Sequence, residues 1–221
     1  MIFPLLLILN LEMSPALAGL ALIPTTLPMV ILSPLAGRWY DRVGGRPPLV
    51  VGFGVLALSG FVLAVGADSG SYLDILPGLL LYGIGLALVL TVNDPVTLDT
   101  IPDRDHGQAS GVSATAEQGG GAIGIAVLYA LFHSAYVSRL HEIVDRSPLP
   151  DLTNATGQAL RANLEAAEAT GLRPAQFDSS LVKYLPPAEA ASGHGYAVAF
   201  AAVGILALIG LAAVTLLVRK A

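Results

Sequence analysis

Apolar residues run through this chain in long uninterrupted stretches, and the polar residues between them are few and clustered. A helix that crosses the hydrocarbon layer of a membrane needs about 20 mostly apolar residues. The pattern therefore predicts five membrane-spanning helices, with approximate bounds at residues 15–37, 48–67, 75–98, 110–132 and 195–218.

One further apolar run, Ile2 to Leu11, is only about half a span. A chain start at this point would leave the terminal ammonium inside the bilayer, which is unfavourable. We therefore expect a truncated first helix, either because the gene is truncated or because another chain completes it.

Composition supports lipid as the solvent. Hydrophobic residues make up 54% of the 221 positions and charged residues only 12%, which is more apolar than a soluble domain of this length can bury. The absence of cysteine excludes disulfides, thiolate metal sites and cysteine nucleophiles. The net charge of −5, with no basic tail, argues against nucleic acid as a partner. We expect an all-α integral membrane protein in contact with the lipid bilayer.

Cations are concentrated at two places, which sets the expected orientation. Arg38, Arg42 and Arg46 lie between the first two spans, and Arg219 and Lys220 end the chain. The positive-inside rule places both segments in the cytoplasm. The four later spans join these two points and satisfy this arrangement, so we expect a multi-pass protein of the cell membrane with a cytoplasmic C-terminus.

The segment 134–194 is the least apolar part of the chain and is expected to lie outside the cell. Residues 155–170 are Ala-rich with helical charge spacing, and "LPPAEAASGHG", residues 185–195, is typical of a linker. The expected organisation is a truncated helix with an outer turn, a membrane region with a cytoplasmic loop at 37–48, an extracellular loop with short helices, and a last helix with its tail: residues 1–13, 14–133, 134–194 and 195–221.

The cytoplasmic loop carries a recognisable pattern, with small and charged residues at fixed spacing: Gly37-x-x-x-Asp41-Arg42-x-Gly44-x-Arg46. It resembles the loop signature of the major facilitator superfamily, in the copy found in the C-terminal half. Four other segments resemble, in order, successive helices of the fourteen-span drug:proton antiporters: "MSPALAGLALIP" (13–24), "PGLLLYGIGLAL" (77–88), "IPDRDHGQASGVSATAEQGGGAIGIAVL" (101–128) and "GYAVAFAAVGILALIG" (195–210).

The resemblance implies the C-terminal six-helix half of a major facilitator fold, built as a 3+3 inverted repeat, with five full spans and a truncated first helix. It also implies a missing N-terminal half as partner, and a gating role for the loop residues. Gly37 and Gly44 would allow tight turns and close helix approach, and Asp41 would accept hydrogen bonds from a neighbouring helix start. The sequence departs at Gly45, where the family often has a second cation. The alternative is that the arginines only set topology.

Two acids lie inside predicted spans, Asp94 and Glu117, with no Lys or Arg at their depth. A charged carboxylate without a partner in lipid is unfavourable and tends to take up a proton, which is what proton-coupled antiport needs. We treat both as candidate proton, cation or substrate sites, with Asn93 and Gln118 as hydrogen-bonding neighbours. Alternatively, Asp94 reaches the cytoplasmic interface and caps a helix broken at Pro95, and Glu117 either extends toward the membrane interface or pairs with a residue of the missing half.

Glycines in the spans are interpreted as packing surfaces. On span 110–132 the small residues Ala116, Gly120 and Gly124 are spaced four apart and form a ridge on one face of the helix. On span 75–98 the small residues that would allow a close helix approach are Gly78, Gly83 and Gly85. The segment "HEIVD", residues 141–145, resembles half of a zinc-protease signature but lacks the second His, so we expect no metal and no cofactor.

Three functions are compatible with these features. The leading one is a transporter, not an enzyme, that exports small lipophilic or cationic molecules against protons by alternating access. The second is a non-transporting fragment or accessory membrane subunit, because one half offers only one wall of a transport site. The third is an intramembrane acid protease, which would need Asp94 and Glu117 to share a proton at close contact.

Overall fold

The computed structural model describes residues 2–11, 13–67, 69–99, 101–146 and 185–218, and these ranges contain helices and turns but no strand. The expectation of short helices at 155–170 lies outside the described residues. The elements in chain order are α1 (Ile2–Leu5), the π-helix η1 (Leu6–Asn10), α2 (Pro15–Ala21), α3 (Ile23–Val43), α4 (Arg46–Ala67), α5 (Tyr72–Leu98), the 3-10 turn η2 (Asp103–Asp105), α6 (His106–Arg146) and α8 (Leu185–Leu217).

The prediction of five membrane-spanning helices is confirmed. Five helical segments of the described chain are long and apolar enough to cross a bilayer, with bounds Pro15–Val43, Arg46–Ala67, Tyr72–Leu98, Asp103–Glu142 and Ala190–Leu217. The first of these combines α2 and α3. The all-α membrane fold expected from the hydrophobic pattern is therefore the observed one.

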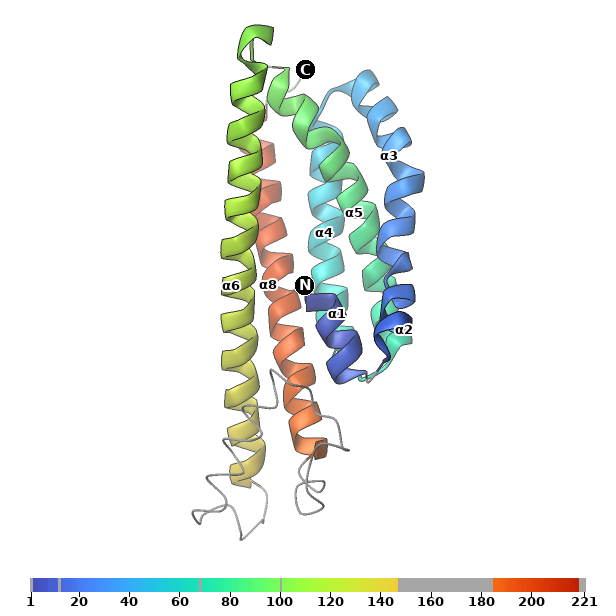
Figure 1. The fold of residues 1–221 in the computed structure, drawn as a ribbon, viewed down its shortest axis with the longest axis vertical. Helices are drawn as coiled ribbons and strands as arrows, with labels where there is room; N and C mark the ends of the chain where they lie inside the picture. The colour runs from blue at the N-terminus through green and yellow to red at the C-terminus, as the bar shows by residue number, and fades with distance from the viewer. Residues whose placement is uncertain (1, 12, 68, 100, 147–184, 219–221) are drawn as a thin grey trace.

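The helices form an elongated bundle in which α4 lies at the centre (Figure 1). It packs most extensively against α5 and α8, while α3 packs on α5 and α6 packs on α8. The peripheral helices α3 and α6 consequently lie on opposite sides of the bundle. Within the most apolar window of each segment, 44% of residues are buried in α4 and in α5, but only 6% in α6.

One end of the bundle carries the α3–α4 junction, and we call it the loop end. The end of α8 lies there as well, because the guanidinium of Arg46 donates a hydrogen bond to the carbonyl of Thr215 at 2.6 Å. The end of α5 and the start of α6 lie at the same end (Figure 1). Four helices, α4, α5, α6 and α8, therefore lead from the α3–α4 junction back to the same end of the bundle, as the topology argument requires.

Proline explains the break in the first span. The chain turns at Leu22 between α2 and α3, and Pro24 occupies the first turn of α3. Proline has no N–H to donate to the carbonyl four residues earlier. It is therefore tolerated in the first turn of a helix, and it favours a break in the helix just before it. The helix is thus briefly interrupted just before Pro24, while Pro28 lies inside the continuous helix α3.

The 37–48 loop is much shorter than expected. Helix α3 continues to Val43 and α4 begins at Arg46, so only Gly44 and Gly45 are non-helical. Gly44 adopts φ = 76°, and its N–H donates to the carbonyl of Tyr40 at 2.8 Å. A left-handed glycine that closes a helix in this way permits a very tight reversal.

The linker interpretation of residues 185–195 is wrong, because these residues form the first turns of α8. Its prolines lie in the first turn of the helix, where they are tolerated. Gly195 faces α6 so closely that a Cβ would lie 2.8 Å from the ring of Phe132. Helix α6 likewise runs to Arg146 instead of ending near Phe132. Both helices extend past α1 and α2 at the end opposite the loop end (Figure 1).

A buried hydrophobic cluster lies at that opposite end. Leu6 and Leu7 of η1 are 0% and 1% exposed and pack with Leu79 of α5 and with Phe200 of α8. The short N-terminal run is therefore part of the core, as its apolar sequence indicates.

Candidate functional site

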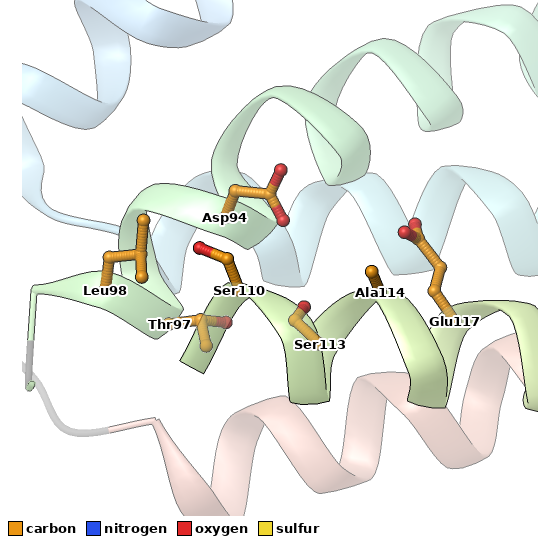
Figure 2. Close-up of a pocket in the computed structure, with 7 residues that line it drawn as sticks. All are labelled: Asp94, Thr97, Leu98, Ser110, Ser113, Ala114 and Glu117. Atoms are coloured by element: carbon orange, nitrogen blue, oxygen red, sulfur yellow. The ribbon is translucent and has the colours of Figure 1, made fainter. Parts of the chain in front are cut away.

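A cavity of about 280 Å³ opens between α5 and α6 in the half of the bundle nearer the loop end. Both membrane acids selected from the sequence line it. Asp94 lies about one turn before the end of α5, and Glu117 about three turns after the start of α6. The residues that line it, none of them basic, are Asp94, Thr97, Leu98, Ser110, Ser113, Ala114 and Glu117 (Figure 2).

The two carboxyl groups occupy opposite ends of this cavity. Asp94 lies toward the Ser110 end, and Glu117 is at the far end (Figure 2). Ser110 and Glu117 are seven residues apart on α6, which corresponds to about 10 Å along the helix. No hydrogen bond joins the two carboxyl groups in the described chain, so the arrangement does not support an acid protease that needs them to share a proton.

Three hydroxyl groups also line the cavity, and the sequence interpretation missed them. Ser113 and Ser110 come from α6, and Thr97 comes from α5, where its hydroxyl donates to the carbonyl of Asn93 at 2.9 Å. Ser110, Ser113, Ala114 and Glu117 follow the spacing i, i+3, i+4 and i+7. That spacing marks one face of a helix, so a polar stripe on α6 could have been found from the sequence.

Neither acid has an ion pair with any described residue. Both side chains are exposed to the open cavity and the adjoining surface. The alternative in which Asp94 caps a helix broken at Pro95 is wrong, since α5 continues through Pro95 to Leu98. The hydrogen-bonding neighbours Asn93 and Gln118 are not among the lining residues.

The signature residues at the α3–α4 junction have different environments. Asp41 and Arg42 are exposed, and among the described residues neither makes a hydrogen bond. Gly37 lies inside α3, and no atom lies within 4 Å of the point where its Cβ would be, so it permits no close approach there. Gly44 makes the tight turn that was expected of it.

Arg46 is the one junction cation with a defined structural contact among the described residues. Its bond to the Thr215 carbonyl places a positive charge at the C-terminal turn of α8, where the helix dipole favours a cation. Arg46 therefore ties the start of α4 to the end of α8, while Arg38 and Arg42 face outward.

Gly45, where the signature often has a cation, leaves no room for a side chain. A Cβ at this position would collide with the Cγ2 of Val96 on α5. The departure from the signature therefore lets the junction approach the last turn of α5. Tyr40 makes a second link there, because its hydroxyl donates a hydrogen bond to the carboxylate of Asp99.

The glycines of α5 and α6 differ in what surrounds them. A Cβ at Gly83 would collide with the carbonyl of Thr25 on α3, and one at Gly85 would lie 2.6 Å from Leu56 on α4. By contrast, no atom lies within 4 Å of a Cβ at Gly120 or Gly124. The ridge on α6 therefore has no packing partner among the described residues.

These features can be set beside known proteins. A sequence model described as Major Facilitator Superfamily matches residues 1–137, more than half of the chain. The chain belongs to the major facilitator superfamily. The family expected from the loop signature is confirmed, and together with the five apolar helices it makes this chain part of a multi-pass membrane protein.

Relatives within the family have names that refer to drugs. The chain is 32% identical over 212 residues to the tetracenomycin C resistance and export protein of Streptomyces glaucescens, covering 95% of this chain and 38% of that protein. It is 32% identical over 138 residues to the multidrug resistance protein Stp of Mycobacterium tuberculosis, covering 62% and 25%. It is 27% identical over 208 residues to a tetracycline resistance determinant of Streptomyces rimosus, covering 89% and 60%.

The chain thus spans between a quarter and three fifths of the length of these three proteins. The similarity to the tetracenomycin C protein extends over nearly the whole chain. All three names concern resistance to drugs or antibiotics, so the chain resembles drug-resistance members of the family.

Proposed function

We propose that this chain forms one wall of the transport pathway in a proton-coupled exporter of small drug-like molecules, which works by alternating access. The observation that carries the proposal is the cavity between α5 and α6, with two carboxyl groups and no basic residue lining it. The names of the relatives, which refer to multidrug, tetracenomycin C and tetracycline resistance, support drugs as the substrate class.

Glu117 is the proposed coupling group. It lies deeper from the loop end than Asp94, and no basic residue lines the cavity to neutralise its charge. A lipophilic cation entering the cavity would stabilise the charged form and displace the proton. Loss of the proton to one side and of the drug to the other is the exchange that antiport requires.

Asp94, nearer the end of α5, is the proposed second site of the same cavity. Its position about one turn from the helix end gives it access to water at the loop end. Thr97, Ser110 and Ser113 supply hydroxyl groups that can donate to or accept from a bound drug or water.

The loop end is proposed to face the cytoplasm of a cell membrane. The argument is the positive-inside rule applied to Arg38 and Arg42, which are exposed. The open face of α6 is proposed to contact the N-terminal half of the transporter, which would supply the second wall of the cavity.

The test is drug-dependent proton movement in vesicles that contain the complete transporter, with tetracycline as the probe and a pH-sensitive dye inside. Glu117→Gln should abolish the drug-dependent signal while leaving the protein folded. Thr115→Val is the matched control, because the Thr115 hydroxyl donates to its own helix at Gly111, outside the cavity. Unchanged proton movement in Glu117→Gln would exclude Glu117 from coupling.

A second candidate function is that of a non-transporting membrane subunit. The observation in its favour is the exposed α6, with only 6% of its most apolar window buried. Co-expression with the corresponding N-terminal half separates the two: transport restored by the pair supports the exporter, and transport never restored supports the subunit.

A further inference from the structure

The part of α5 that lines the cavity contains a proline, where the helix lacks one backbone hydrogen bond. Pro95 lies inside α5, has no N–H for the carbonyl of Thr91, and crowds the preceding turn. Asp94 comes directly before this proline, while Thr97 and Leu98 come after it. The last turn of α5 can therefore change its angle without unfolding the rest of the helix.

Two contacts from the α3–α4 junction hold this last turn in place. The hydroxyl of Tyr40 donates to the carboxylate of Asp99, directly after the end of α5. The backbone at Gly45 lies against the side chain of Val96, one residue after the proline, with no room for a Cβ between them. The two contacts come from either side of the Gly44 turn, so the junction contacts the last turn of α5 at two points.

We propose that Tyr40 is a positioning residue for the cavity. Its hydrogen bond to Asp99 fixes the last turn of α5 at the angle that places Thr97 and Leu98 in the cavity wall opposite Ser110. A movement of the α3–α4 junction is transmitted by this bond to the mouth of the cavity. The consequence for transport rests on the function proposed above, whereas the positioning itself does not.

The lack of cysteine allows a direct test. Leu98→Cys introduces a single thiol into the cavity wall, and its rate of reaction with a charged maleimide is measured in nanodiscs. Adding Tyr40→Phe removes only the hydroxyl, so the last turn of α5 should sample other angles. The labelling rate is expected to change by about two- to tenfold, the range expected for loss of one typical hydrogen bond.

The matched control removes a similar bond at the other end of the same helix. The hydroxyl of Tyr72 donates to the carbonyl of Ala21 at 2.9 Å. Tyr72→Phe should leave the labelling rate at Leu98→Cys unchanged. An equal change in both variants would show a general loosening of the bundle and would overturn the positioning role.

Rescue and coupling distinguish positioning from a loss of folding. Asp99→Asn keeps an acceptor oxygen and should preserve the original rate, whereas Asp99→Ala should reproduce the effect of Tyr40→Phe. The double variant Tyr40→Phe with Asp99→Ala should add nothing further. Additive effects, or an unchanged rate in Tyr40→Phe, would overturn the inference.

Failure of the proposed function gives a different result. If Tyr40→Phe changes the labelling rate while Glu117→Gln leaves drug-dependent proton movement intact, the positioning role stands and the coupling proposal fails. If Glu117→Gln abolishes proton movement while Tyr40→Phe labels at the original rate, the coupling proposal stands and the positioning role fails.

Discussion

Glycine-rich faces occur on both α4 and α6, and the two faces have opposite environments. Gly60 of α4 lies against Gly204 of α8 so closely that a Cβ would lie 2.5 Å from the Gly204 nitrogen. On α6, the positions of Gly120 and Gly124 have no atom within 4 Å of a Cβ. Small residues let helix backbones approach in lipid. The comparison teaches that such a pattern identifies a packing face but does not identify where its partner is.

The same contrast extends to the polar groups of the two helices. Ser59 of α4 is 0% exposed and donates to the carbonyl of Gly78 on α5 at 2.9 Å. Thr115 of α6 is exposed and bonds only within its own helix, to Gly111. Helix α4 thus packs extensively on two neighbours, α5 and α8, whereas α6 packs mainly on α8.

The largest expected effect comes from filling the packed face. Gly60→Ala forces the backbones of α4 and α8 apart, because the new methyl group meets backbone atoms that cannot rotate away. We expect a loss of about 1–3 kcal/mol in the free energy of unfolding. This corresponds to a drop of about 2–4 °C in Tm for each kcal/mol in a chain of this size. Thermal unfolding in detergent, followed by circular dichroism, measures it.

The control for this variant lies in the same helix. Gly54 of α4 has no atom within 4 Å of its Cβ position. Gly54→Ala should leave Tm unchanged or raise it slightly, because alanine is the better helix former. Equal losses in both variants would contradict the assignment of Gly60 to the α4–α8 contact.

A smaller loss is expected from the interhelical hydrogen bond. Ser59→Ala removes the donor to the Gly78 carbonyl, so the destabilisation should be about 0.5–1.5 kcal/mol, near the lower figure in a membrane. Thr115→Ala removes a hydroxyl that makes no contact between helices. In the same detergent unfolding assay, only the first variant should lower Tm. A loss for Thr115→Ala as large as that for Ser59→Ala would contradict the contrast between α4 and α6.

Replacing Arg46 should affect stability only locally, at the C-terminal end of α8. Arg46→Met keeps the length of the side chain but removes the donor to the Thr215 carbonyl, for an expected loss of about 0.3–1 kcal/mol. The last turn of α8 should fray, so hydrogen–deuterium exchange at Leu217 and Val218 should become faster. Arg42→Met should not alter this exchange, because Arg42 is exposed and has no such bond. Slow exchange in Arg46→Met would show that the contact does not hold the helix end.

Much of the fold was accessible from the sequence, because the energy of burying a span depends on its length and apolar content. The helix ends were less accessible. Residues 185–195 contain two prolines and two glycines, which favour a linker when considered locally. In the structure the prolines begin α8 and Gly195 packs against Phe132. Tertiary contact with α6 therefore overrides the local preference.

The site was accessible only in part. Asp94 and Glu117 stand out because charge is rare inside an apolar span. Their companions Ser110 and Ser113 are common in membrane helices and become informative only through their spacing to Glu117. The contact of Tyr40 with Asp99 joins residues far apart in the sequence, and no local pattern predicts such a pair.

The smallest expected effect on the chain itself is the sharpest test of the comparison. Gly120→Ala should leave the Tm of the isolated chain unchanged or raise it slightly, because no described atom is close to the new methyl group. Any gain reflects the preference of a helix for alanine over glycine, about 0.4–1 kcal/mol in the free energy of unfolding. In the complete transporter the same variant should weaken the contact between α6 and the N-terminal half, and drug transport should fall while the Tm of the isolated chain does not. A loss of stability in the isolated chain would mean that the glycine face of α6 already packs within this chain. Unchanged transport in the complete protein would mean that lipid, and not a second half, covers this face.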